Sequence, residues 1–580
     1  MERKKNERFT VRIQDSSEDG AGIGKVDGYI WFIKDTVIGD LVEASVMKTK
    51  KSYGFARALR ILEPSPFRVE PRCPVAKACG GCSLQAMSYE EQLRFKERKI
   101  RDALERIGGV KQLTMEPIMG MEDPWRYRNK AQFPVGKDKT GRVIFGFYAD
   151  RSHTIIENED CFLGVEENKQ ILQVVRAYME RFGITPYDEE DHRGLVRHVL
   201  IRKGFRTGEL MVCLVINGET LPHEEWLVEE LVREIDDPKN DLSGTESSSS
   251  DPEKDRGHIV SISYNINMEK TNVILGHKVV DLYGPGYITD YIGAIRYQIS
   301  PLSFYQVNPV QTEKLYGTAL EYAGLTGEEA VWDLYCGIGT ISLFLAQRAK
   351  KVYGVEIVPA AIEDARRNAE LNGIENVEFF VGKAEEVLPW AYRERGAYAD
   401  VVVVDPPRKG CDKVCLDTIV EMGAERVVYV SCDPATLARD VKYLGEKGYE
   451  VVKGRGCDMF PGTGHVETVV MLSHKKPDSV INVKVEFGEG EGKVPLDNIA
   501  KRAEAYKPKE RVTYKMIKEY IEAKYGFKVH TAYIAEVKRE LGLPMYDAPN
   551  AVEELKQPRK HPTAEKAEAI KDALRYYKVI

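Results

Sequence analysis

Two short polar segments in the second half of the sequence follow valine-rich runs, and their residue types could perform covalent chemistry. Asp405-Pro-Pro-Arg-Lys-Gly410 comes after Val401–Val404, and Ser431-Cys432-Asp433 comes after the run that ends at Val430. Such runs are typical of buried parallel strands, and open α/β sheets hold their ligands at the carboxyl ends of those strands. Cys432 is therefore predicted to be a nucleophile that faces a bound planar substrate. Because Asp433 would hinder ionisation of this thiol, we expect its carboxylate to point away from the sulfur.

A carboxylate further along the chain could serve as the base that such a nucleophile needs. Glu467 ends the segment that starts at Phe460 and stands at the start of an apolar, strand-like run. Carbon 5 of a uracil ring attacks a sulfonium methyl group only after a thiolate has added at carbon 6, and a base must later remove the carbon 5 proton. Cys432 and Glu467 meet these two requirements, provided that the site helps Cys432 to ionise.

A glycine-containing loop precedes these segments and predicts an adenosyl-binding pocket. The loop Asp333–Thr340 follows one expected strand and opens a helix, and Glu356 ends the next strand. Glycines allow close approach of the backbone to a ligand, and the acid can accept hydrogen bonds from ribose hydroxyls. Ser342 stands where the third glycine of a dinucleotide motif would lie, so the loop favours S-adenosylmethionine over NAD. An NAD-dependent oxidoreductase remains the alternative from this loop.

The elements that must position these residues alternate between strand and helix patterns from about residue 300 to 475, which predicts an α/β, doubly wound parallel sheet. Strand-sized runs with glycine turns over residues 8–63 predict a small β-barrel, and this segment resembles a TRAM domain, an RNA-binding barrel. Residues 236–256 are acidic and serine-rich and predict an exposed insertion or a disordered loop rather than a domain. Two helices, Thr513–Tyr525 and Thr531–Leu541, could form a helix-turn-helix binder or a packing appendage.

Bulk composition describes a globular protein with locally basic segments. Of the 580 residues, 43% are hydrophobic and 30% are charged, and the net charge is -7. No apolar stretch is long enough for a membrane span and no signal peptide is evident, so we expect a cytoplasmic protein. Two basic clusters could nevertheless bind RNA phosphates, or be solvated faces: Lys48, Lys50, Lys51, Arg57 and Arg60; and Arg126, Arg128, Lys130, Lys137, Lys139 and Arg142.

Four of the ten cysteines are spaced as ligands rather than as disulfide partners. Cys73, Cys79 and Cys82 lie in a C-x5-C-G-G-C pattern, and Cys161 follows alone. Four thiolates can hold zinc or an iron–sulfur cluster, and spacing alone does not separate the two.

Taken together, these motifs resemble the RNA uracil-5-methyltransferase family over about residues 8–475. The resemblance implies that Cys432 is the nucleophile, that Glu467 is the proton acceptor and that the four spaced cysteines hold a 4Fe–4S cluster. It also implies S-adenosylmethionine contacts, namely Gln306, Tyr335, Thr340, Glu356, Lys383 and Asp405. The barrel and the cysteines together resemble the large-subunit (23S) ribosomal RNA enzymes of the family; a tRNA T-loop uridine is the alternative substrate, and a non-catalytic RNA-binding or ribosome-assembly protein is the rival outside enzymes.

We therefore expect four regions and a monomer. They are a TRAM-like barrel (1–64), a mixed α+β central domain with the iron–sulfur cysteines (65–290), a Rossmann-like methyltransferase domain (291–478) and a helical C-terminal extension (479–580).

Overall fold

A computed structural model describes residues 3–17, 19–237, 257–474, 514–541 and 561–577. The chain divides into two compact units, residues 1–478 and 479–580. Most of the expected acidic insertion, residues 238–256, lies outside the described residues. No helix in the described ranges has the length and apolar character needed to cross a membrane.

The N-terminal strands form a closed barrel, as the sequence predicted. The order around the barrel is β1-β2-β3-β5-β4, and β3 pairs with β5 in parallel. Residues on β1 alternate between exposed and buried, and the interior holds Val11, Trp31 and Val42. The strands are β1 (Arg8–Ser16), β2 (Gly22–Val26), β3 (Tyr29–Lys34), β4 (Leu41–Thr49) and β5 (Tyr53–Glu63).

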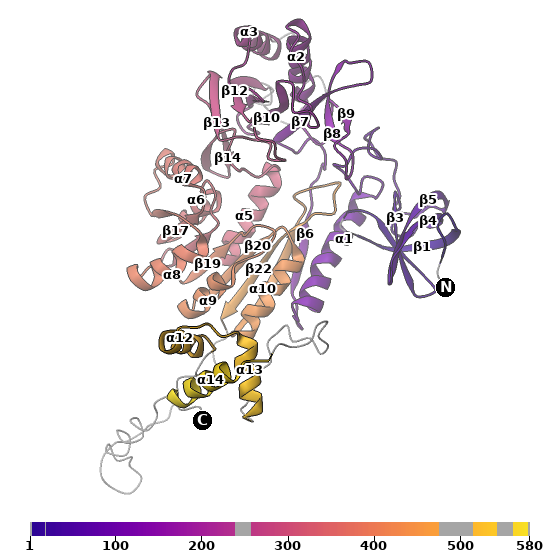
Figure 1. Ribbon diagram of the computed structural model, residues 1–580. Coiled ribbons are helices and arrows are strands. Elements are labelled where there is room, and N and C mark those ends of the chain that lie inside the picture. The colour runs from indigo at the N-terminus through magenta and orange to yellow at the C-terminus, as the bar shows by residue number, and fades with distance from the viewer. Residues whose placement is uncertain (1–2, 18, 238–256, 475–513, 542–560, 578–580) are drawn as a thin grey trace. The chain divides into compact units, whose positions relative to one another are not determined.

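The central region is a seven-stranded sheet with two helices on one face (Figure 1). Strand β10 shows why the sheet has two buried faces: Val199 and Ile201 pack under α2 and α3, whereas Leu200 joins a core on the opposite face. The strand order is β13-β12-β11-β10-β7-β8-β9. The elements are β7 (Lys130–Lys137), β8 (Val143–Tyr148), β9 (Ile155–Glu157), β10 (Val196–Lys203), β11 (Glu209–Ile216), β12 (His258–Ile266), β13 (Lys278–Tyr283), α2 (Glu167–Arg181) and α3 (Glu224–Asp236).

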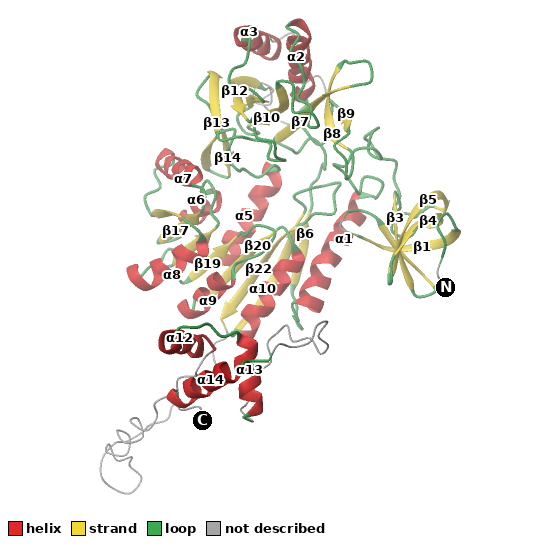
Figure 2. Cartoon of the chain, in the orientation of Figure 1, coloured by secondary structure: helices red, strands yellow, loops and turns green. Residues whose placement is uncertain are grey.

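The α/β domain is an eight-stranded sheet with helices on both faces (Figure 2). Its order is β18-β17-β16-β19-β20-β22-β21-β6. The strands are β6 (Met115–Met119), β16 (Ala330–Leu334), β17 (Lys351–Glu356), β18 (Val377–Val381), β19 (Val401–Val404), β20 (Arg426–Ser431), β21 (Tyr449–Cys457) and β22 (Glu467–His474). Helices α5 (Pro309–Ala323), α6 (Thr340–Ala346) and α7 (Pro359–Leu371) contribute to the core on one face. Helices α8 (Ala384–Arg395), α9 (Lys413–Met422) and α10 (Pro434–Glu446) contribute to the other, with α1 (Tyr89–Asp102) and its π-helical continuation η1 (Ala103–Ile107).

Two features of this sheet differ from the sequence-based expectation. The sheet is mixed rather than purely parallel, because β22 runs antiparallel to both β20 and β21. Strand β6 comes from the segment assigned to the central region, yet it pairs with β21 at the sheet edge. Short apolar strands carry no signal of direction or partner, which explains both differences.

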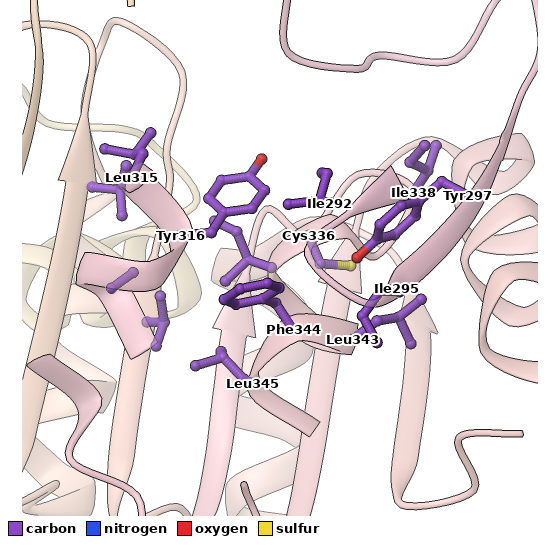
Figure 3. Packing of buried hydrophobic residues seen from close by; sticks show 14 of the residues in the cluster. Ile292, Ile295, Tyr297, Leu315, Tyr316, Cys336, Ile338, Leu343, Phe344 and Leu345 are labelled. Atoms are coloured by element: carbon purple, nitrogen blue, oxygen red, sulfur yellow. The ribbon is translucent and has the colours of Figure 1, made fainter. Parts of the chain in front are cut away.

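An apolar core joins the hairpin β14 (Ile288–Ile292) and β15 (Ile295–Ile299) to helices α5 and α6 (Figure 3). Tyr316 of α5 lies beside Phe344 of α6, with ring centroids 6.3 Å apart. The hydroxyl of Tyr297, on β15, donates to the backbone oxygen of Thr340 at the start of α6. The core thereby fixes the helix that begins at the glycine loop.

The second unit is a small helical bundle. Its helices are α12 (Tyr514–Tyr525), α13 (Thr531–Glu540) and α14 (Ala564–Tyr576), with Ile521, Ile534 and Ile570 in the shared core. The first two agree with the sequence, whereas α14 was not expected.

Candidate active site

A cavity of about 1070 Å³ lies at the carboxyl ends of the α/β strands. Its wall includes the glycine loop after β16, the end of β17, the segment after β19 and the residue after β20. Seven residues singled out from the sequence line it: Gln306, Tyr335, Thr340, Glu356, Asp405, Cys432 and Glu467. Lys383 does not: it is exposed at the start of α8 and forms an ion pair with Glu386.

The glycine loop is a tight connection with left-handed backbone at three positions. Tyr335, Gly337 and Gly339 have φ values of 69°, 55° and 81°. A Cβ atom on Gly339 would lie 3.1 Å from that of Ala365, so the loop packs closely on α7. Glu356 accepts hydrogen bonds from the backbone N–H groups of Gly337 and Val358, at 3.3 and 3.0 Å. The acid is therefore fixed beside the loop, where it can receive ribose hydroxyls.

Asp333, which begins the glycine loop, and Ser342, which replaces the third glycine of a dinucleotide motif, form a hydrogen bond with each other. Asp333 is fully buried and accepts a hydrogen bond from the Ser342 hydroxyl. Burial raises the pKa of Asp333 to about 7, and the nearby Asp405 adds to the rise. This hydrogen bond connects the end of β16 to α6, and so it restrains the loop between these two elements.

Cys432 lies between β20 and α10, at the cavity wall. Asp433 caps α10 by accepting hydrogen bonds from the N–H groups of Ala435 and Thr436, both at 2.9 Å. Its carboxylate is therefore engaged in capping α10, in agreement with the expectation that it points away from the Cys432 sulfur. The pKa of the Cys432 thiol is raised to about 11, first by burial and then by Glu467 and Asp405, against the opposing effect of Arg408.

Glu467 is the first residue of β22 and is buried. Its pKa is raised to about 8 by burial and by Asp405, again opposed by Arg408. Burial also raises the pKa of Asp405 to about 7. Three acidic groups thus share one poorly solvated space, which is the arrangement that adjusts groups for proton transfer near neutral pH.

The Asp-Pro-Pro segment and the nucleophile are held by the same helix. Asp440 of α10 accepts hydrogen bonds from the Cys411 N–H at 2.9 Å and the Tyr429 hydroxyl at 2.7 Å. Gly410 has φ +80°, and a Cβ there would lie 2.6 Å from Asp440 Oδ2. Arg439 donates to the backbone oxygen of Lys409 at 2.9 Å. Helix α10 therefore sets the position of the segment from Asp405 to Cys411 relative to Cys432.

The loop between β21 and β22, residues 458–466, leads into Glu467 and is held from the N-terminal side. The buried Lys96 of α1 pairs with the buried Asp458 and donates to the backbone oxygen of Phe460 at 3.0 Å. The backbone N–H groups of Ser83 and Leu84, which follow Cys82, donate to the backbone oxygen of Gly462 at 3.0 and 2.9 Å. The cysteine segment thus supports the loop that carries the candidate base.

Sequence reasoning assigned no role to two further lining residues. Arg408 lies in the Asp-Pro-Pro motif and opposes the raised pKa values of Cys432 and Glu467. Its position within the motif is a signal that could have identified it. Tyr316 donates to or accepts from the Thr340 hydroxyl at 3.1 Å. A lone tyrosine on a helix gives no comparable signal.

Three of the four spaced cysteines have raised pKa values, and Cys161 contributes to each rise. Burial, and then Cys161, raises the pKa of Cys73 and of Cys79. The pKa of Cys82 is raised to about 12, by burial first and then by the other three thiols. Their donor chemistry suits a soft metal or an iron–sulfur cluster. Within the described ranges, however, no three His, Cys, Asp or Glu side chains converge in a metal-binding arrangement.

An α/β sheet with a cavity at its strand ends, a glycine loop and a strand-end acid define an enzyme that binds a nucleotide-like ligand. Comparisons with known proteins are more specific. The tRNA (uracil-5-)-methyltransferase profile matches residues 287–475, and the TRAM profile matches residues 2–59. An uncharacterized RNA methyltransferase of Halalkalibacterium halodurans is 52% identical over 81% of this chain and 98% of its own length. One of Clostridium tetani is 48% identical over 81% and 97%.

A solved structure also covers most of the chain. The Pyrococcus abyssi tRNA (uracil-54, C5)-methyltransferase, in complex with S-adenosyl-L-homocysteine, is 27% identical. It matches 80% of this chain and 99% of its own, with a TM-score of 0.62. The chain belongs to the S-adenosylmethionine-dependent RNA uracil-5-methyltransferase family.

Proposed function

We propose that this protein transfers a methyl group from S-adenosylmethionine to carbon 5 of a uridine in RNA, with Cys432 as the nucleophile and Glu467 as the base. One observation carries the proposal: Cys432, Glu467 and Asp405 line the same cavity as the glycine loop and Glu356. A donor at the loop and a base ring at Cys432 can therefore meet in one space.

The residues of the donor end fit an adenosyl ligand. We propose Glu356 for the ribose hydroxyls and Gln306, Tyr335, Thr340 and Asp405 for the remaining contacts. Lys383 is also proposed as a donor contact, although its side chain lies outside the cavity lining. When bound, S-adenosylmethionine supplies the electrophilic methyl group and a positive sulfonium charge.

The chain's own groups would then act in order. The ionised sulfur of Cys432 forms a bond to carbon 6 of the uracil, and the electron pair of the ring double bond moves to carbon 5. Carbon 5 then takes the methyl group, whose bond to the donor sulfur breaks and leaves its electron pair on that sulfur. Glu467 removes the proton from carbon 5, and the pair left behind restores the double bond as the carbon–sulfur bond breaks. The cation of Arg408 favours the ionised forms of both residues. The uridine must leave its stack to reach this buried position.

A 5-fluorouridine transcript tests the covalent step, because fluorine at carbon 5 cannot be removed as a proton. With the methyl donor present, we expect a denaturation-stable complex between RNA and wild-type protein and none with Cys432→Ala. If wild-type protein forms no such complex, the proposal is overturned. Glu467→Gln should trap an ordinary uridine transcript in the same way. The non-catalytic alternative instead predicts that Cys432→Ala leaves the cellular role intact.

We further propose 23S ribosomal RNA as the substrate. The barrel together with the four spaced cysteines supports this choice. A tRNA T-loop uridine is the second candidate, which the similarity to the Pyrococcus abyssi tRNA enzyme favours. Labelled donor incubated with separated rRNA and tRNA fractions distinguishes the two. Mapping 5-methyluridine in RNA from cells with and without the protein would then locate the site.

We propose that Cys73, Cys79, Cys82 and Cys161 hold a 4Fe–4S cluster. The electrostatic effect of Cys161 on Cys73, Cys79 and Cys82 supports a shared site. Protein purified without oxygen should be brown, with visible absorbance and about four irons per chain. A colourless protein with one zinc per chain would contradict it. We also propose a cytoplasmic monomer, which light scattering and cell fractionation can test.

A further inference from the structure

Two cations face each other across neighbouring strands of the central sheet. Lys130 on β7 and Arg202 on β10 are directly paired in the antiparallel register. Side chains opposite each other in this way lie on the same face, and like charges there are destabilising. The face is the one that carries Leu200, toward the core shared with the α/β domain. Such a repulsion is relieved either by loss of the lysine proton or by a compensating anion.

No compensating carboxylate is present in the part of the chain that the structure describes. Neither Lys130 nor Arg202 forms an ion pair there, and the charges that act on Lys130 are those of Arg202 and Arg128. Arg202 is 2% exposed, and its Nε and Nη1 atoms have no hydrogen-bond partner. Burial, and then the two arginines, lowers the pKa of Lys130 to about 7. Buried charges are normally paired, so this cluster is unusual.

Hydrogen bonds to backbone oxygen atoms connect the cluster of Lys130, Arg128 and Arg202 to residues that line the candidate catalytic cavity. The Nη2 atom of Arg202 donates to the backbone oxygen of Ser303, a lining residue. Asn129, beside Lys130, donates to the backbone oxygen of Gln306 at 2.9 Å. Between these two anchors lies Phe304, which also lines the cavity and is 70% exposed. Lys130 and Arg128 are partly exposed, so both are accessible to a ligand.

We propose that Lys130 and Arg128, over the fixed charge of Arg202, form a phosphate site for the RNA backbone next to the target uridine. This inference rests on the proposed function, because it assigns a part of the same substrate. A nucleotide whose base enters the cavity brings its flanking phosphates to the cavity wall. A phosphate there supplies the missing negative charge and positions the base over Cys432.

The test compares Lys130→Met with Lys169→Met, an exposed lysine on α2 that belongs to neither basic cluster. The probe is a fluorescein-labelled, uridine-containing single-stranded RNA, titrated at several salt concentrations. We expect Lys130→Met to weaken binding about tenfold and to reduce the salt slope by about one contact. Lys169→Met should stay within about twofold of wild type, and Lys130→Arg should restore most of the affinity.

Two further measurements separate the explanations. S-adenosylmethionine affinity should not change in Lys130→Met; an equal loss of donor affinity would mean that the cluster serves the donor carboxylate, and would overturn the proposal. The melting temperature of Lys130→Met should rise, since a repulsion is removed. Unchanged RNA affinity and salt slope would overturn the phosphate site alone. A protein that methylates no RNA, yet loses a salt-dependent contact in Lys130→Met, would retain the site and lose the proposed function.

Discussion

At the residue scale, the proposed chemistry would use acidic groups whose pKa values are raised by burial in one cavity. Cys432, Glu467 and Asp405 all have raised pKa values because they share a buried cavity, and Arg408 is the cation that opposes the rise for the first two. A thiol with a high pKa is a strong nucleophile once ionised, and a carboxylate with a high pKa is a strong base. The charge of a bound sulfonium would favour both ionisations.

The pH dependence of methyl transfer should follow from these values. Both groups act in their ionised forms, and both pKa values are raised, to about 8 for Glu467 and about 11 for Cys432. We therefore expect kcat/KM to increase with pH through about 8, rather than to level off near the ordinary carboxyl pKa. Arg408→Gln should move this rise to higher pH, because it removes the cation that lowers both values.

Initial rates over a pH series, with protein stability checked at each pH, measure this profile. In Glu467→Gln, the rate of covalent complex formation should depend on the Cys432 ionisation alone. A wild-type rate that is flat or falls between about pH 6 and about pH 9 would contradict the assignment.

At the element scale, helix α10 and the loop 458–466 act as supports for the reactive residues. A substitution at Gly410 tests the support that helix α10 gives. Gly410→Ala places a side chain in left-handed backbone and against the buried carboxylate of Asp440. Gly423, which ends α9 with φ +68°, is its matched control, because a Cβ atom there would have no neighbouring atom within 4 Å.

Both glycine substitutions should cost about 1–2 kcal/mol of unfolding free energy from backbone strain. Gly410→Ala should cost more than Gly423→Ala and should also lower kcat, because it displaces the Asp405 segment. Denaturant unfolding and methylation assays compare the pair. Equal effects of the two on activity would contradict the role given to α10.

Substitutions in the buried pair of Lys96 and Asp458 test the support that the loop 458–466 gives to Glu467. Lys96→Met leaves Asp458 buried without its cation, which should cost roughly 3–5 kcal/mol. It should also lower activity, because the hydrogen bond to Phe460, ahead of Glu467, is lost. The double variant Lys96→Met/Asp458→Asn should recover stability but not full activity. Recovery of both would mean that Lys96 has no positioning role.

At the scale of the whole molecule, every candidate catalytic and donor residue lies in the first unit. The second unit has its own core, and every described residue that lines the cavity belongs to the first unit. A chain ending at residue 478 should therefore bind S-adenosylmethionine within about twofold of the full protein. Its RNA affinity decides between the two interpretations of the C-terminal helices: a loss indicates a nucleic-acid binder, and no change indicates a packing appendage. Loss of donor binding on truncation would contradict the independence of the first unit.

The sequence by itself determined the local chemistry. Valine-rich runs followed by Asp405 and by Cys432, and the glycine loop with Glu356 one strand later, predicted a cavity at the strand ends because parallel strands end at one edge. Strand-sized runs separated by glycine turns predicted the barrel for a similar reason, since turns and short strands are recognised from neighbouring residues. These signals depend on residues close together in the chain.

Only the tertiary structure decided which distant segments meet. It placed β6 at the edge of the α/β sheet, reversed β22, and brought Lys96 to Asp458 across the chain. It also left Lys383 outside the cavity and set Lys130 opposite Arg202. Pairing between remote segments depends on how whole faces pack and on which charges are desolvated together, and no local pattern records those energies.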